Sequence, residues 1–132
     1  MRNKIILFLG FFLLLGMAVA EAPFSEPMQN PDARYRLFPT QNMWTFLKLD
    51  TMTGQIWQVQ FSTKGADYRF ETTLSSDDIT DALKLEKKSG RFTLYPTENM
   101  YNFVMLDKIN GHTYQVQWSG ESENRFVVPI SD

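Results

Sequence analysis

The sequence has 132 residues, a formal net charge of −2 at pH 7 and no cysteine. The lack of cysteine excludes disulfide bonds, thiol catalysis and cysteine-rich metal sites. The acidic balance argues against nucleic acid and against anionic membrane surfaces as partners.

The first twenty residues have the pattern of a secretory signal peptide. Arg2 and Lys4 precede an apolar run over residues 5–15, and the small residues Ala18 and Ala20 follow it. A basic start, a short apolar core and small residues at positions −3 and −1 are typical of a cleaved signal, so we expect the cut after Ala20. The run is shorter than the roughly 20 residues that a membrane-spanning helix needs, so we expect no stable membrane insertion after cleavage. The sequence therefore predicts a periplasmic or secreted protein.

Residues 21–33 come next and include three prolines without a periodic apolar pattern. This composition predicts an extended, flexible lead-in. We expect the remaining residues, 34–132, to form a single β domain.

That domain contains an internal repeat. Residues 34–62 match residues 91–119 at an offset of 57 without a gap, and fourteen of the 29 positions are identical. After a one-residue deletion the match resumes, with Arg69 and Phe70 corresponding to Arg125 and Phe126. The repeats therefore span about 34–75 and 91–132, with a linker at 76–90.

Each repeat has the pattern of four short strands, which lie at about 34–38, 43–50, 55–62 and 68–74 in the first copy. The short connections predict an antiparallel meander. One such unit exposes an apolar face, so we expect two units to form one all-β, eight-stranded sandwich or barrel with approximate two-fold symmetry. In the linker, acidic residues precede basic ones, which indicates a short helix with Ser76 as a possible cap, although an ordered loop is equally compatible.

The third strand of each repeat alternates clearly. Trp57, Val59 and Phe61 share one face in the first copy, and the second copy has Tyr114, Val116 and Trp118 at these positions. We expect this aromatic face to be the core in both copies. The strand at about 43–50 is apolar on both faces. It is therefore either buried on both sides, or one side meets a ligand or a partner.

Two resemblances rest on these motifs. The stretch Leu49-Asp50-x-x-Thr53-Gly54-x-x-Trp57 resembles the blade motif of pyrroloquinoline-quinone-type β-propellers. Two units are too few to close a propeller, which has four to eight blades, so this resemblance implies shared hairpin chemistry and no cofactor. The full pattern, from Pro-Thr-x-Asn-Met through Leu-Asp-x-x-x-Gly to Gln-Val-Gln, is similar to that of small exported proteins of Bacteroidetes-type gut bacteria. This group has no assigned activity, so the resemblance implies export and the repeat but no site.

Few residues are candidates for catalysis. Asp50 and Asp107 occupy equivalent positions, but an Asp at the start of a turn ordinarily caps it. As the acids of a glycan hydrolase they would have to lie about 5–9.5 Å apart. His112 is the only histidine, and the first copy has Gln55 in its place. We therefore predict no catalytic residue, no metal site and no cofactor.

Binding is the function that the composition favours. Trp44 and Tyr101 occupy equivalent sites after the first turn of each repeat, and the third strands carry matched amides at Gln58, Gln60, Gln115 and Gln117. Aromatic side chains beside amides suit sugars or peptide backbones, although a core plus a solvated sheet face would produce the same pattern.

The sequence thus predicts an exported, non-enzymatic binding or protein-interaction module whose partner is a protein or a glycan of the cell envelope. The alternatives are a glycan-acting hydrolase that uses the turn carboxylates, and a periplasmic inhibitor or assembly accessory that pairs through an exposed strand edge.

Overall fold

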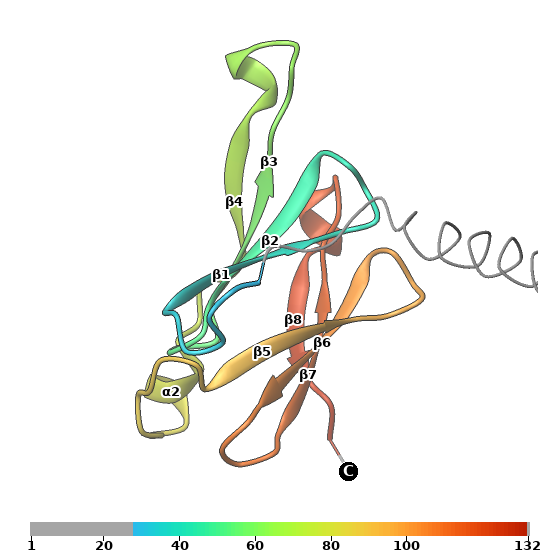
Figure 1. The fold of residues 1–132 in the computed structure, drawn as a ribbon. Helices are drawn as coiled ribbons and strands as arrows, with labels where there is room; N and C mark the ends of the chain where they lie inside the picture. Colours follow the sequence, from blue (N-terminus) through green and yellow to red (C-terminus); the bar gives the residue numbers. More distant parts are fainter. Residues whose placement is uncertain (1–27, 132) are drawn as a thin grey trace, which may run out of the picture.

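A computed structural model describes residues 28–131, so the predicted signal peptide lies outside the described residues. The eight strands form two separate four-stranded antiparallel sheets, ordered β1-β2-β3-β4 (sheet 1) and β5-β6-β7-β8 (sheet 2) (Figure 1). Sheet 1 contains β1 (Tyr35–Pro39), β2 (Thr45–Asp50), β3 (Ile56–Gln60) and β4 (Phe70–Ser75). Sheet 2 contains β5 (Phe92–Pro96), β6 (Asn102–Asp107), β7 (Thr113–Gln117) and β8 (Phe126–Pro129). The predicted all-β fold of two tandem meanders is confirmed, and the sheets form a sandwich rather than a closed barrel.

The shared turn sequences explain why both repeats fold alike. In the β1–β2 turn the Thr40 hydroxyl donates to the backbone oxygens of Asn42 and Thr45, at 3.0 and 2.8 Å. The Thr97 hydroxyl makes the same two bonds in the β5–β6 turn. Gly54 adopts a positive φ of 82° at the end of the β2–β3 turn, a conformation that glycine adopts readily.

The linker contains one helical turn, α2 (Ile79–Ala82), so the predicted short helix is present. Its N-cap is Asp78, whose side chain accepts a hydrogen bond from the Asp81 amide, and the prediction of Ser76 as the cap was wrong. The helix packs on the β2–β3 turn, because the Ile79 amide donates to Thr53 O at 2.9 Å and a Cβ added to Gly54 would lie 2.8 Å from Ile79 Cδ1.

Part of the predicted lead-in contacts the first strand. The Gln29 side chain makes hydrogen bonds to both the amide and the carbonyl of Leu37, at 3.0 and 2.7 Å. Asp32 lies so close to Gly90 that a Cβ there would be 2.7 Å from its side chain. These contacts attach residues 29–32 to the edge of β1 and to the end of the linker.

The two sheets share one core but contribute unlike faces to it. The inner face of sheet 1 holds Phe38, Leu47, Leu49, Ile56 and Gln58, which are buried. The inner face of sheet 2 holds Phe92, Leu94, Phe103, Met105, Tyr114 and Val116, which are also buried. At the offset of 57 residues between the repeats, the counterparts of these sheet 2 residues form the outer face of sheet 1. They are Tyr35, Leu37, Phe46, Lys48, Trp57 and Val59.

This arrangement corrects the predicted core of the first repeat. Tyr114, Val116 and Trp118 are buried as expected, but Trp57 and Val59 are only half-buried and Phe61 is 42% exposed. A two-fold axis would bring equivalent faces together, whereas here opposite faces meet, so the expectation of two-fold symmetry was wrong. Instead, one face of the repeat in sheet 1 packs on the opposite face of the repeat in sheet 2, a relation that we call head-to-tail.

Unlike-face packing predicts unequal costs for equivalent substitutions. Phe103 is 3% exposed in the core, whereas its counterpart Phe46 lies half-buried on the outer face of sheet 1. We expect Phe103→Ala to lower the free energy of unfolding by about 3–5 kcal/mol and Phe46→Ala to lower it by less than half as much, because only the first leaves a core cavity. Urea denaturation measures both values, and equal losses would contradict the described packing.

Candidate functional site

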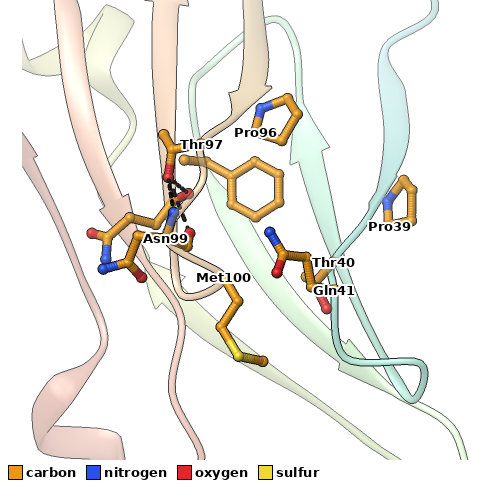
Figure 2. A pocket seen from close by; sticks show the side chains of 9 residues that line it. Pro39, Thr40, Gln41, Pro96, Thr97, Asn99 and Met100 are labelled. Carbon is orange, nitrogen blue, oxygen red and sulfur yellow. Dashed lines mark hydrogen bonds between the residues drawn. The ribbon is translucent and has the colours of Figure 1, made fainter.

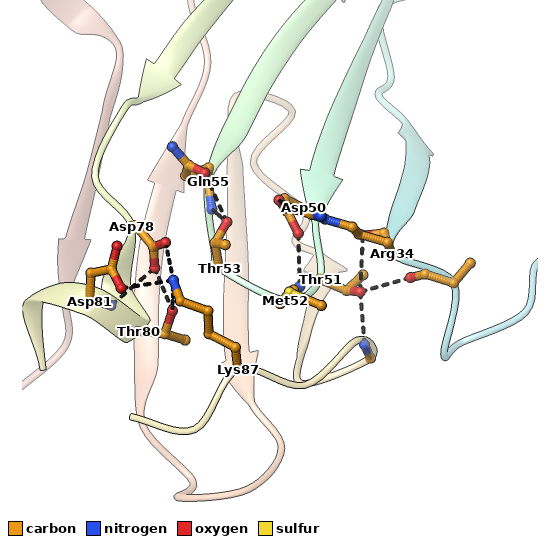
Figure 3. A network of polar contacts seen from close by, with 12 residues as sticks. Arg34, Asp50, Thr51, Met52, Thr53, Gln55, Asp78, Thr80, Asp81 and Lys87 are labelled. Atoms are coloured by element: carbon orange, nitrogen blue, oxygen red, sulfur yellow. Dashed lines mark hydrogen bonds and ion pairs between the residues drawn. The ribbon is translucent and has the colours of Figure 1, made fainter. Parts of the chain in front are cut away.

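The turn carboxylates are the acids that sequence analysis singled out, and each is engaged within its own repeat. The Asp50 carboxylate accepts a hydrogen bond from the Met52 amide at 3.0 Å and pairs with Arg34, whose Nη2 lies 3.2 Å from Asp50 Oδ2 (Figure 3). The hydrogen bond from Arg34 to the Asp50 carboxylate raises the pKa of Arg34 above its ordinary value. The geometry is that of a turn cap joined to the start of β1.

Asp107 repeats this arrangement in sheet 2 with greater burial. Its carboxylate accepts a hydrogen bond from the Ile109 amide at 2.9 Å, and Arg91 Nε lies 2.9 Å from Asp107 Oδ2. The Arg91 side chain is 3% exposed, compared with 51% for Arg34. Both carboxylates are buried and bonded in separate turns, which favours the turn-cap interpretation over a hydrolytic role.

The difference in burial predicts different roles for the two pairs in stability. Asp107→Asn leaves Arg91 buried without its counter-charge, so we expect a loss of about 3–5 kcal/mol in the free energy of unfolding. The matched variant Asp50→Asn should lose less, because the exposed part of Arg34 can be solvated. Chemical denaturation measures the free energy of unfolding of both variants. A larger loss in Asp50→Asn than in Asp107→Asn would contradict the predicted order.

A second polar network holds α2 against the end of the linker (Figure 3). Lys87 Nζ lies 2.6 Å from Asp78 Oδ2 and 2.8 Å from Asp81 Oδ1. Partial burial raises the pKa of Asp78, but hydrogen bonds from Lys87, the Thr80 hydroxyl and the Asp81 amide lower it more, and the resulting pKa is about 2. The network is local to the linker and serves to fix it.

The lowered pKa of Asp78 predicts a pH-dependent contribution to stability. Because the ordinary pKa is 3.8 and the folded value is about 2, the contribution is full above pH 3.8 and is lost as the pH falls through 2. We expect Asp78→Asn, which retains a capping side chain, to be less stable than the parent at pH 6, and the gap to close towards pH 2. Urea denaturation midpoints of both proteins between pH 2 and pH 6 test this prediction. A stability difference that does not change with pH would contradict a lowered pKa for Asp78.

The four glutamines of the third strands occupy different surroundings in the two repeats. Gln58 is 1% exposed and lies between the sheets, where its Oε1 accepts a hydrogen bond from the Ser119 amide at 3.3 Å. Its predicted role in contacting an external ligand was therefore wrong. Gln60 is half-buried and lies 3.4 Å from the Tyr68 carbonyl oxygen. In sheet 2, Gln115 and Gln117 lie half-buried on the outer face.

The two predicted aromatic binding residues remain accessible but belong to separate clusters. Trp44 is 36% exposed and packs on Phe61 with 5.2 Å between ring centroids. Tyr101 is 46% exposed and packs on Trp118 at 4.9 Å. Trp44 lines a shallow hollow of about 300 Å³ with Phe61, Tyr68 and neighbouring polar residues.

A second hollow, of about 180 Å³, lies between the first turns of the two repeats (Figure 2). Pro39, Thr40 and Gln41 line it from the first repeat, and Pro96, Thr97, Asn99 and Met100 are among those that line it from the second. The side chain hydroxyl of Thr97 is already bonded within its own turn. None of the residues that line this hollow is charged.

His112 lies exposed beside the β6–β7 turn, where its backbone amide donates to Asn110 Oδ1 at 2.9 Å. Within residues 28–131, no group of three or more His, Cys, Asp or Glu side chains is placed to hold a metal ion. In the same range no helix is long and apolar enough to cross a membrane.

The outer face of sheet 1 is an apolar surface that no contact within the described residues covers completely. Tyr35 and Leu37 are 53% and 45% exposed, and Trp57 and Phe46 are half-buried beside them. One ion pair lies on this face, between Lys48 Nζ and Glu71 Oε1 at 2.8 Å, with the Lys48 ammonium 5.0 Å from the centre of the Trp57 ring. Sequence analysis did not identify Tyr35 and Leu37; its one signal for this surface was the apolar character of both faces of the strand at 43–50.

Comparison with known proteins gives no assignment. No protein-family model, no curated protein and no solved structure significantly matches this chain.

Proposed function

We propose that this chain is an exported, non-enzymatic protein-interaction module whose binding surface is the outer face of sheet 1. The observation that carries the proposal is the chemistry of that face, because the residues that form it have counterparts that make up the core in sheet 2. Leaving such an apolar face in water costs free energy, and covering it with a partner lowers the free energy.

A protein partner fits this face better than a glycan does. Tyr35, Phe46 and Trp57 give this sheet face three aromatic side chains, and aromatic residues are enriched in protein interfaces. The amides expected to bind sugars are not gathered on it, since Gln115 and Gln117 lie on the other sheet. Export is supported by the signal-like pattern of residues 1–20.

A non-enzymatic role is supported by the state of the two candidate acids. Asp50 and Asp107 are each held by an arginine and by turn amides, and both are buried. The edge-pairing alternative has less support at β1, because the Gln29 side chain already bonds the backbone of Leu37 there.

Site-specific photo-crosslinking in the cell envelope tests the proposal. A photoreactive residue placed at position 37 should yield protein adducts, because Leu37 lies on the proposed surface. The matched control is position 109, where Ile109 is 52% exposed but lies in the β6–β7 turn outside this face. Equal labelling at both positions, or adducts to glycan alone at position 37, would contradict a protein-binding face.

A further inference from the structure

We infer that the partner of the outer face of sheet 1 is a second copy of this chain, which presents the outer face of its own sheet 2. Copies of the chain would then associate head-to-tail. This inference rests on the proposed function and names the partner of the same surface.

The internal interface is the template for this association. Within one chain, the inner face of sheet 1 packs on the inner face of sheet 2. Because the repeats are equivalent and the packed faces are opposite ones, each face left outside is the repeat counterpart of a face already packed. Phe46 and Val59 on the outer face of sheet 1 correspond to Phe103 and Val116 in the core.

The outer face of sheet 2 has the complementary relation. It carries Tyr95, Val104 and Leu106, the counterparts of Phe38, Leu47 and Leu49 on the inner face of sheet 1. Tyr95 is 52% exposed, although its counterpart Phe38 is 8% exposed. Both outer faces therefore keep most of the apolar character of the packed faces, and together they form the same pair of unlike faces.

The polar groups that join the sheets also have counterparts in the other copy of the repeat. Gln58 Oε1 accepts a hydrogen bond from the Ser119 amide between the sheets. The corresponding residues are Gln115 on the outer face of sheet 2 and Ser62, two residues after the end of β3. Gln115 donates from its Nε2 to Asn102 Oδ1 at 2.8 Å, which leaves the oxygen as the atom to accept from Ser62 of the next copy.

The differences between the faces indicate a weaker interface than the internal one. The Lys48–Glu71 ion pair stands where sheet 2 has Met105 and Val127, and Thr113 stands where sheet 1 has Ile56. Substituting polar groups for apolar ones lowers the free energy gained on burial. The association should therefore be reversible and should depend on protein concentration.

The geometry of unlike faces determines the kind of assembly. A contact between unlike surfaces is heterologous, and it produces a ring when the rotation between neighbours closes. Four to eight four-stranded sheets around an axis are known to close. Since each chain supplies two sheets, the assembly we infer is a closed ring of two to four copies.

Two single-face variants and their mixture test the inference. Leu37→Glu places a carboxylate on the outer face of sheet 1, opposite Lys48 across the strands, and Tyr95→Glu does so on the outer face of sheet 2. The control is Ile109→Glu in the β6–β7 turn. All are made in residues 21–132, which contain every described residue. Molar mass is measured by light scattering over a concentration series, and circular dichroism verifies folding.

We expect the parent and Ile109→Glu to reach two to four times the monomer mass, and each face variant alone to remain a monomer. The mixture of the two variants should form a species of two chains and no larger one, because each supplies the intact face that the other lacks. If either variant fails to fold, Phe61→Glu replaces Leu37→Glu and Val128→Glu replaces Tyr95→Glu, since these exposed residues lie on or next to the same faces.

A parent that stays monomeric at all concentrations would overturn the inference, as would association that Leu37→Glu abolishes but Tyr95→Glu leaves unchanged. The second result would indicate contact between like faces. Neither result removes the proposed function, because photo-crosslinking at position 37 to a different protein would still support it. Loss of both the crosslink and the self-association would remove both.

Discussion

The packing of two sheets through unlike faces is the interaction on which the rest of this structure depends. Duplication produces two sheets of similar sequence, and each has two faces with apolar residues. One contact between two sheets can bury only two of these four faces. The chain buries the face that contains Leu47 and Leu49 from sheet 1 and the face that contains Phe103 and Met105 from sheet 2. The core, the exposed aromatic surface and the inferred self-association all follow from that choice.

The turns preserve the geometry that makes this packing possible. Thr40 and Thr97 close the first turns with identical hydrogen bonds, and Asp50 and Asp107 cap the next ones. These turn residues, which are identical in both repeats, therefore act within a sheet, and their hydrogen bonds do not depend on which face of the sheet is covered. Contacts between the sheets instead use residues whose repeat counterparts have different surroundings: Gln58 is buried between the sheets, whereas the equivalent and identical Gln115 lies on the outer face of sheet 2.

Much of the fold could be predicted from sequence, because strands, turns and the repeat are local patterns. The strand order, the short helix and the capping role of the turn carboxylates are all present. The covered face could not be predicted, because strand alternation separates two faces without indicating which one meets the other sheet. Equivalent residues were assumed to have equivalent surroundings, and Trp57 and Tyr114 show that they do not. One signal was available: Lys48 occupies the position of Met105, and a lysine is rarely found in a core.

The residues of the candidate site were likewise predictable only where their exposure depends on local sequence. Trp44 and Tyr101 could be identified as accessible aromatic residues because they lie next to turns, where a side chain is seldom covered. Tyr35 and Leu37 could not, because their exposure depends on the absence of a sheet over β1 and its neighbours.

Thiol accessibility measures the covered face most directly, because the chain has no cysteine of its own. Val59→Cys and Val116→Cys introduce single thiols at equivalent positions with little change in volume. At low protein concentration, where the chain is monomeric, a thiol reagent should modify position 59 readily and position 116 only when the domain unfolds. Equal protection of both thiols, or faster reaction at position 116, would contradict packing through unlike faces.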